Sequence, residues 1–238
     1  MAPFYLVERG LFPSMKKRIV FVISGGQIRN LTYIQAKLKA HAWAEVICAD
    51  GGAHHLHSLG LIPDAIIGDM DSLSSDEEKY FEERGSRIIR YPEEKDETDT
   101  QLAIEYALEM NPEEIWIFGA LGGRIDHTLA NISLLVLGAK RGIKTKLIDE
   151  WCEVSVVTGS CVIEGEAGQT VSLLPLSSVV TGITLEGFEY ALKDGTMEIG
   201  DPYGVSNRLR EARGVISVDS GYLLVVRYFK AGVFPDWT

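Results

Sequence analysis

Several aspartates in the first half of the chain follow short apolar runs, at points where a strand would end and a loop begin. They occur in Asp50-Gly51-Gly52, Gly68-Asp69-Met70-Asp71-Ser72, Lys95-Asp96-Glu97-Thr98-Asp99 and Gly122-Gly123-Arg124-Ile125-Asp126-His127. If the strands are parallel, these loops meet at one edge of the sheet, where the carboxylates would raise each other's pKa unless a cation joined them. Magnesium takes one or two carboxylates together with water and phosphate oxygens. The pattern therefore predicts a metal site that handles phosphate groups.

Asp69 and Asp71 are the pair most suited to sharing one ion. In an extended segment, residues two apart point to the same side, so both carboxylates would reach the same cation. A turn followed by a helix cap is the alternative for any single motif of this kind, because Asp and Ser favour both. Four such motifs at successive strand ends favour a site. The acids around Asp76–Glu78 and Glu82-Glu83 accompany Lys79 and Arg84, which indicates a solvated helix face.

Two glycine-rich loops indicate phosphate binding. Ser24-Gly25-Gly26 follows the first apolar run, and Gly119–Arg124 follows a later one. Glycines allow the backbone to approach a ligand closely, helix N-terminal amides favour anions, and Arg124 adds a planar charged donor. Tight turns explain the glycines equally well, and neither loop matches the P-loop or dinucleotide fingerprint. Lys95 contacts either a phosphate or a neighbouring carboxylate.

The histidines do not form a recognisable metal set. His54, His55 and His57 fall on one short predicted helix, and His54 and His57 share a face. No Cys, Asp or further His completes a zinc-ligand pattern around them.

The elements that must position these residues change halfway along the chain. Up to about Asp149, apolar runs alternate with helical stretches, which predicts a parallel sheet covered on both faces. The expected strands are Ile19–Ile23, Glu45–Ala49, Ala65–Ile67, Arg87–Arg90, Ile115–Phe118 and Lys146–Ile148, and the expected helices are Leu31–Lys39, Ala53–Leu59, Ser75–Arg84, Thr98–Met110 and His127–Lys140. After about Glu150 the chain consists of short β-rich runs separated by turn residues such as Lys193-Asp194-Gly195, which predicts a sandwich.

The predicted fold is therefore α/β, with an N-terminal Rossmann-like parallel sheet with helices on both faces and a C-terminal all-β sandwich domain. We expect an N-terminal extension at 1–15, an α/β catalytic domain at 16–150 and the sandwich at 151–238. The net charge of -11 argues against a nucleic-acid partner. No run reaches the roughly 20 apolar residues of a membrane span, so no membrane partner is expected. Three widely spaced cysteines suit a cytoplasmic location.

Taken in order, the four aspartate motifs, together with Pro63-Asp64 and Asn131, resemble those of the thiamine pyrophosphokinase family. Gly204-Val205-Ser206-Asn207 and Gly221–Val225 resemble that family's second domain, so the resemblance extends from about Lys17 to Phe229. It implies an α/β catalytic domain and a thiamine-binding β-sandwich, in a homodimer with the active site at the subunit interface. It also implies transfer of pyrophosphate from ATP to thiamine with magnesium, giving thiamine diphosphate and AMP.

The same resemblance implies a role for each matching residue. Asp69, Asp71 and Asp99 resemble the catalytic and metal-holding acids. Separately from the resemblance, the chemistry requires a base for the hydroxyl proton, and we expect it to be either Asp71 or Asp99. Ser206 and Asn207 resemble thiamine contacts, while the aromatic partner of the thiamine ring is left open between Tyr222 and Trp237. The nucleotide-binding residues would be Asp50, Lys95, Asp96, Thr98, Gly122, Gly123, Arg124, Asp126 and His127.

Two other functions share these features. A magnesium-dependent nucleotide phosphohydrolase would use the same carboxylates and phosphate loops without an acceptor alcohol. A non-catalytic nucleotide- or thiamine-binding protein would bind the same ligands without turnover.

Overall fold

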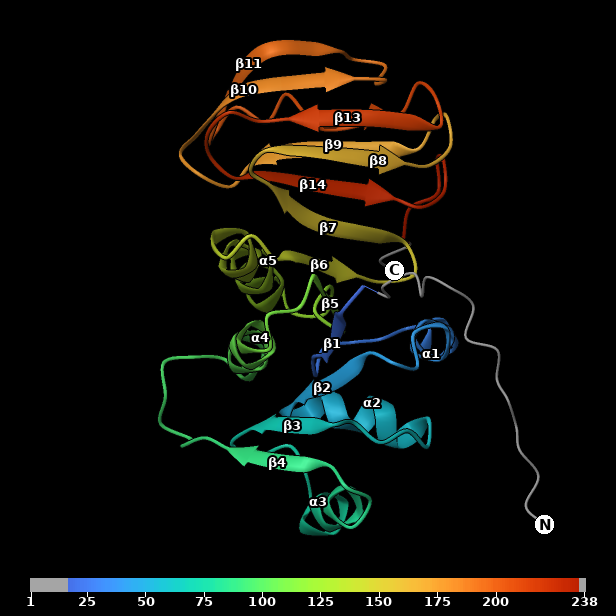
Figure 1. The fold of residues 1–238 in the computed structure, drawn as a ribbon, viewed down its shortest axis with the longest axis vertical. Coiled ribbons are helices and arrows are strands. Elements are labelled where there is room, and N and C mark those ends of the chain that lie inside the picture. Colours follow the sequence, from blue (N-terminus) through green and yellow to red (C-terminus); the bar gives the residue numbers. More distant parts are fainter. Residues whose placement is uncertain (1–16, 236–238) are drawn as a thin grey trace, which may run out of the picture.

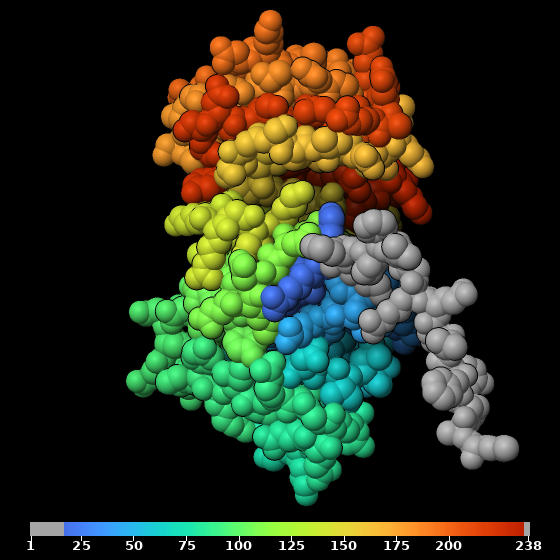
Figure 2. All heavy atoms as spheres, viewed as in Figure 1, coloured from blue at the N-terminus to red at the C-terminus, as the bar shows by residue number. Residues whose placement is uncertain are grey.

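The structure is a computed structural model that describes residues 17–235. The predicted extension at 1–15 and Trp237 lie outside the described residues. Figure 1 shows an elongated molecule with helices and strands at one end of its long axis and strands alone at the other. In the space-filling view, the residues after about 150 form that second end (Figure 2).

Six parallel strands form the first part of the main sheet. They are β1 (Ile19–Ile23), β2 (Glu45–Ala49), β3 (Ala65–Gly68), β4 (Arg87–Arg90), β5 (Glu114–Phe118) and β6 (Lys144–Ile148), in the spatial order β4-β3-β2-β1-β5-β6. The chain adds strands on one side of β1 as far as β4 and then returns to the other side with β5. Ligands in such sheets bind beyond the carboxyl ends of the strands where the order reverses, which here lies between β1 and β5.

Helices cover both faces of this parallel part (Figure 1). They are α1 (Leu31–Ala40), α2 (Ala53–Ser58), α3 (Ser75–Glu82), α4 (Asp99–Glu109) and α5 (Ile125–Lys140), and a 3₁₀ turn at Asp50–Gly52 precedes α2. Val20 and Val22 of β1 pack with α4 and α5, whereas Phe21 and Ile23 pack with α1, α2 and α3. Because β1 is buried on both faces, its sequence is apolar at every position rather than at alternate ones.

The second part is built from antiparallel strands in two layers. The main sheet continues through β7 (Cys152–Val157), β14 (Leu223–Tyr228), β9 (Thr170–Pro175) and β12 (Asn207–Arg208). A second sheet has the order β11 (Leu192–Glu198), β10 (Val179–Glu186), β13 (Arg213–Ser217) and β8 (Ser160–Glu164). Side chains such as Leu173 and Val225 from one sheet and Ile183 and Ile216 from the other form a common buried core. The predicted fold class is confirmed.

The boundary between the two parts lies within a continuous sheet, and one turn expected from the sequence is not formed. The expected boundary near Glu150 falls between β6 and β7, but the two strands pair antiparallel, so one sheet runs through both parts. The expected turn at Lys193-Asp194-Gly195 is wrong, because these residues lie inside β11. Asp194 has a φ of 53° and its N–H donates to Thr184 Oγ1 at 3.2 Å, where the β10–β11 register shifts, so turn-type residues here mark a bulge. Among the described residues, no helix is long and apolar enough to span a bilayer.

Candidate active site

A cavity of about 580 Å³ opens at the carboxyl ends of the parallel strands. The loops after β1, β2, β3 and β5 and the segment before α4 surround it. Its lining includes Ser24, Gly25, Gly26, Gln27, Asp50, Gly51, Asp69, Ser72, Glu93, Lys95, Glu97, Thr98, Asp99, Thr100, Gly119, Gly122, Gly123, Arg124, His127 and Asn131. Three of the four aspartate motifs therefore bring an aspartate to the cavity. The fourth motif, which overlaps the second glycine-rich loop, contributes glycine, Arg124 and His127 but not its aspartate.

Three carboxylates converge at one side of this cavity. Asp50 follows β2, Asp69 follows β3 and Asp99 is the first residue of α4, and one carboxylate oxygen from each lies within 4.8 Å of the others. Gly68 makes this approach possible. Its φ is 157°, and a Cβ there would lie 2.7 Å from Asp50 Cβ and 3.1 Å from Asp99 Cγ. A side chain at position 68 would push the acids apart.

Lys95 supplies the positive charge of the group. Its Nζ lies 2.8 Å from Asp69 Oδ2 and 2.9 Å from Asp99 Oδ1, and its side chain is only 10% exposed. The hydrogen bond from Lys95 is the main reason why the pKa of Asp69 lies below its usual value. Burial lowers the pKa of Lys95, but the two carboxylates outweigh burial and raise it overall. Of the two contacts considered for Lys95 from the sequence, the structure shows the one with carboxylates, although the partners are not its neighbour Asp96.

Asp50 is the most buried of the three acids, at 3% exposure. Burial raises its pKa, hydrogen bonding by Ser72 opposes the rise, and the charge of Asp99 adds to it. Asp50 Oδ1 has no hydrogen-bond partner although it is buried. Because an unpaired buried carboxylate oxygen is costly, this atom suits a cation ligand. The acid group thus fits magnesium, a hard cation that takes oxygen ligands.

Asp71 does not belong to this group of three, whose third member is Asp50. The extended segment expected from Asp69 to Asp71 is not formed, because Met70 has a φ of 66° and turns the chain. The N–H of Asp71 instead donates to Asp69 Oδ1 at 3.1 Å, and Asp71 Oδ1 accepts from Ser72 Oγ at 3.1 Å. Asp71 is exposed beside the cavity.

The loop between β5 and α5 presents Arg124 at the opposite side of the cavity lining. Its guanidinium pairs with both carboxylate oxygens of Asp126, at 3.1 Å and 2.5 Å. Those hydrogen bonds are the main cause that lowers the pKa of Asp126 to about 2. Buried Asn131 donates to the carbonyl of Ala120 at 3.0 Å and so fastens the loop to α5. The loop can offer a planar cation and glycine backbone to an anionic ligand.

Not all of the predicted residues reach the cavity. Asp96 is exposed and does not line the cavity. Asp126 does not line it either, but forms an ion pair with Arg124, which does. Ser206 and Asn207 lie in the sandwich and do not line the cavity of this chain. The buried amide of Asn207 is bonded to the backbone of Tyr190 and to the N–H of Arg208.

Sequence reasoning missed several residues of the cavity. Ser24 and Thr100 share a buried hydroxyl–hydroxyl hydrogen bond of 2.6 Å that ties the end of β1 to the start of α4. Glu93 and Glu97 line the cavity from the segment before α4, and Gln27 lines it from the loop after β1. Ser24 lies inside a motif already chosen for its glycines, whereas Thr100 carries no local signal.

Comparison with known proteins gives consistent matches over most of the chain. The family model "Thiamin pyrophosphokinase, catalytic domain" matches residues 37–147, and "Thiamin pyrophosphokinase, vitamin B1 binding domain" matches residues 160–223. A Bacillus subtilis protein, thiamine pyrophosphokinase, is 34% identical over 213 residues, which cover 88% of this chain and 98% of the relative.

Solved structures agree with this match. The crystal structure of the Bacillus subtilis thiamine pyrophosphokinase has a TM-score of 0.78 at 33% identity, covering 90% of this chain and all of that one. The thiamin pyrophosphokinase of Candida albicans has a TM-score of 0.76 at 21% identity, covering 89% of both chains, and shares the fold.

Proposed function

The chain belongs to the thiamine pyrophosphokinase family, and on this premise we propose that it transfers pyrophosphate from ATP to thiamine in the cavity at the β1–β5 switch point. The products are thiamine diphosphate and AMP. The observation that carries the proposal is the meeting of Asp50, Asp69 and Asp99 with two glycine-rich loops around one cavity. Such transfer depends mainly on positioning the substrates and on stabilising charge. The glycine-rich loops can position phosphate groups, and the acids can hold a cation that stabilises their charge.

We assign the magnesium ligands to the acid group. Asp69 and Asp99 were expected from the sequence, and Asp50 joins them because its buried Oδ1 has no other partner. Asp71, which was expected both as a metal ligand and as a catalytic acid, keeps these proposed roles from the exposed side of the loop. Bound magnesium would neutralise charge on the triphosphate oxygens. The same carboxylates, without the ion, would repel that substrate.

We assign the nucleotide to the remaining lining. Arg124 would grip phosphate oxygens, with Asp126 holding its guanidinium in place, and His127 lies beside them in the lining. Gly122 and Gly123 leave room for the phosphates, and both have positive φ values, 86° and 73°. Lys95 and Thr98 line the opposite side, and Asp96 keeps its proposed role at the rim.

We propose that a second copy of the chain supplies the thiamine-binding groups. Ser206 is exposed and has a φ of 62°, and Asn207 holds this segment against Tyr190. Near it in the sequence, Ile199, Tyr203 and Val205 are each at least half exposed, as expected of a surface that another subunit covers. The resulting homodimer would bring Ser206 and Asn207 to the partner's cavity. Light scattering tests this, and a monomer at assay concentration would contradict it.

One assay tests the activity itself. The chain is incubated with ATP, magnesium and thiamine, and AMP is measured with and without thiamine. We expect AMP only when thiamine is present. AMP or ADP without thiamine would favour a phosphohydrolase, and no turnover would favour a binding protein. Asp71→Asn is expected to remove most turnover while leaving the fold intact, and near-wild-type rates at saturating magnesium would contradict its role.

We also propose a cytoplasmic location. The supporting observation is that Cys48, Cys152 and Cys161 are all unpaired, and burial raises the pKa of each thiol, which keeps it in the unreactive form.

A further inference from the structure

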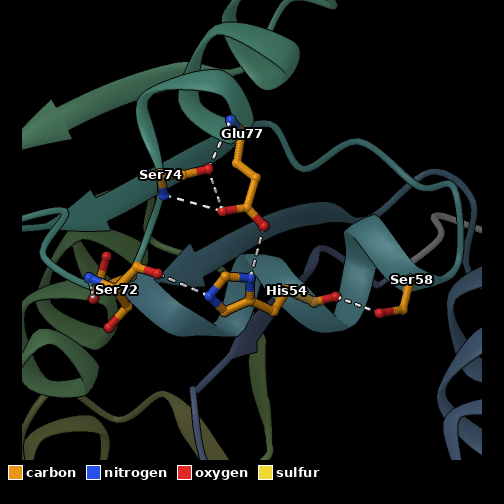
Figure 3. A network of polar contacts seen from close by, with 6 residues as sticks. His54, Ser58, Ser72, Ser74 and Glu77 are labelled. Carbon is orange, nitrogen blue, oxygen red and sulfur yellow. Dashed lines mark hydrogen bonds and ion pairs between the residues drawn. The ribbon is translucent and has the colours of Figure 1, made fainter.

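The three histidines of α2 each contact a different part of the catalytic domain. His54 lies between the loop after β3 and the start of α3 (Figure 3). His55 Nε2 is 2.9 Å from the carbonyl oxygen of Gly26, and the ring of His57 packs edge-on against Tyr80 and Phe81. Of these three rings, that of His54 has a polar contact at each nitrogen, and one of its partners, Ser72, bonds Asp50 and Asp71 in turn.

Both partners of the His54 ring are hydrogen-bond acceptors. Nε2 lies 2.9 Å from the carbonyl oxygen of Ser72, and Nδ1 lies 3.1 Å from Glu77 Oε1 (Figure 3). A backbone carbonyl can only accept, and an ionised carboxylate can only accept. Both contacts are therefore favourable only when both ring nitrogens carry protons. A neutral ring that donates to Ser72 would direct the lone pair of Nδ1 at the carboxylate.

Glu77 is held in its ionised form. Its other oxygen, Oε2, accepts from the N–H of Ser74 at 3.0 Å and from Ser74 Oγ at 2.7 Å, which completes the capping box of α3. Those hydrogen bonds are the main reason why the pKa of Glu77 is lowered, and His54 adds to the effect. Glu77 therefore presents a negative charge to Nδ1 at neutral pH.

We call the contacts of the His54 ring with Ser72 and Glu77 the His54 clamp. Ser72 connects this clamp to the acids. Its N–H donates to Asp50 Oδ2 at 3.3 Å, and its Oγ donates to Asp71 Oδ1 at 3.1 Å. The His54 ring fixes the carbonyl of the same residue. The ring thus holds the loop that carries Asp69 and Asp71 against Asp50.

We propose that His54 is a positioning residue for the transfer reaction, which holds the 68–72 loop in its catalytic position while both ring nitrogens are protonated. This proposal rests on the function proposed above. The titratable groups around the ring are Glu77 on α3, His55 on the same helix, and Asp50 and Asp71, which reach it through Ser72. A ring that loses either proton turns a lone pair toward one of its two acceptors, so deprotonation with rising pH weakens the hold on the loop.

Glu77→Gln provides a matched variant in which the contacts of the His54 ring are satisfied when the ring is neutral rather than doubly protonated. The amide oxygen of Gln would keep the two bonds from Ser74, because Gln also serves at this position of a capping box. The amide nitrogen would face Nδ1 and donate to it, so a neutral ring that donates to Ser72 would satisfy both contacts. The variant clamp should therefore strengthen as pH rises, where the wild-type clamp weakens.

The test is kcat/KM for thiamine-dependent AMP formation from pH 6 to pH 9, with saturating ATP and magnesium. Dividing the wild-type value by the Glu77→Gln value cancels every pH effect common to both. We expect this ratio to fall with pH by about threefold to tenfold, less than the roughly 10- to 100-fold cost of removing a direct partner of a metal ligand. In a His54→Ala background, Glu77→Gln should leave the pH profile unchanged. A constant ratio, or a falling ratio that persists without His54, would overturn the proposal.

A second measurement does not depend on activity. Nitrogen-15 NMR distinguishes a doubly protonated imidazole ring from either neutral tautomer. We expect His54 at pH 6 to carry protons on both nitrogens in the wild-type chain, and at pH 8 to carry one only, on Nε2, in Glu77→Gln. A neutral ring at pH 6 in the wild type would overturn the proposal. Absence of thiamine-dependent AMP in both chains, with the expected NMR signals, would count against the proposed function instead.

Discussion

Lys95 Nζ lies 2.8 Å from Asp69 Oδ2 and also reaches Asp99, so one ammonium joins two of the three acids of the cluster. These side chains are 10%, 14% and 28% exposed, so the surrounding protein shields the contact from water more than it would a surface pair. A cation inside a group of acids allows the chain to fold with the carboxylates already close together.

Lys95→Gln should therefore lower the free energy of unfolding in the absence of magnesium by about 2 kcal/mol, the usual contribution of a hydrogen bond to a charged group. Urea unfolding measures this change. Lys79→Gln is the control, because Lys79 makes an exposed ion pair with Glu83 at 3.8 Å. Exposed pairs of this kind contribute roughly 0.5 kcal/mol or less. Equal losses in the two variants would contradict the role given to Lys95.

The same comparison should depend on pH. The pKa of Asp69 is lowered, so its ion pair contributes fully above the unfolded value of about 3.9 and is lost as pH falls through the lower folded value. The stability difference between wild type and Lys95→Gln should thus be constant from pH 5 to 7 and shrink below about pH 4. A difference that is unchanged at pH 3 would show that packing, rather than charge, explains the loss.

Asp50→Asn should make the chain more stable and less active. The pKa of Asp50 is raised, first by burial, so its stabilising contribution is present below the unfolded value and is lost as pH rises through the folded one. At pH 7 we expect a gain on the order of 1 kcal/mol, typical of a stabilising single substitution. Magnesium affinity, measured by calorimetry, should fall by about tenfold or more. The gain should vanish near pH 3, and a loss of stability at pH 7 would contradict the assignment.

Gly68→Ala should disrupt the acid cluster through space alone. The added Cβ would lie 2.7 Å from Asp50 Cβ, so the loop after β3 must shift. We expect a loss of about 1–3 kcal/mol in the free energy of unfolding, the range for an overpacked site, together with loss of most activity. Gly159→Ala is the control, since nothing lies within 4 Å of its new Cβ. Activity at the control level in Gly68→Ala would show that the acids do not need this spacing.

The strands and helices of the first part were predictable because their apolar patterns are long and regular. The expected strand Ile19–Ile23 coincides with β1, and the expected helix Thr98–Met110 contains α4 (Asp99–Glu109). The sandwich was less predictable, since β11 contains Asp194 and Gly195, whose types usually indicate a turn. A bulge uses the same residues for the same conformational reason, and sequence alone does not distinguish the two.

The site was predictable as a set of loops but not as a set of contacts. Strand-end positions indicated that the aspartates would converge, and Asp50, Asp69 and Asp99 do so. The positive φ of Met70 turns the chain so that Asp71 does not join the cluster of three acids. Methionine does not favour such a turn, so the sequence did not indicate it. His54 and Glu77 are 23 residues apart in the sequence, on α2 and α3, and their pairing depends on tertiary packing, so no local pattern indicates it.

The antiparallel pairing of β6 with β7 limits where the chain can be truncated. The strands from β7 onward continue the sheet whose parallel part carries the cavity, so the two parts of the chain share backbone hydrogen bonds across their boundary. A chain that ended near residue 150 would leave β6 as a bare edge, and such edges template aggregation. The sheet therefore links the two parts of the chain directly, through the backbone pairing of β6 with β7.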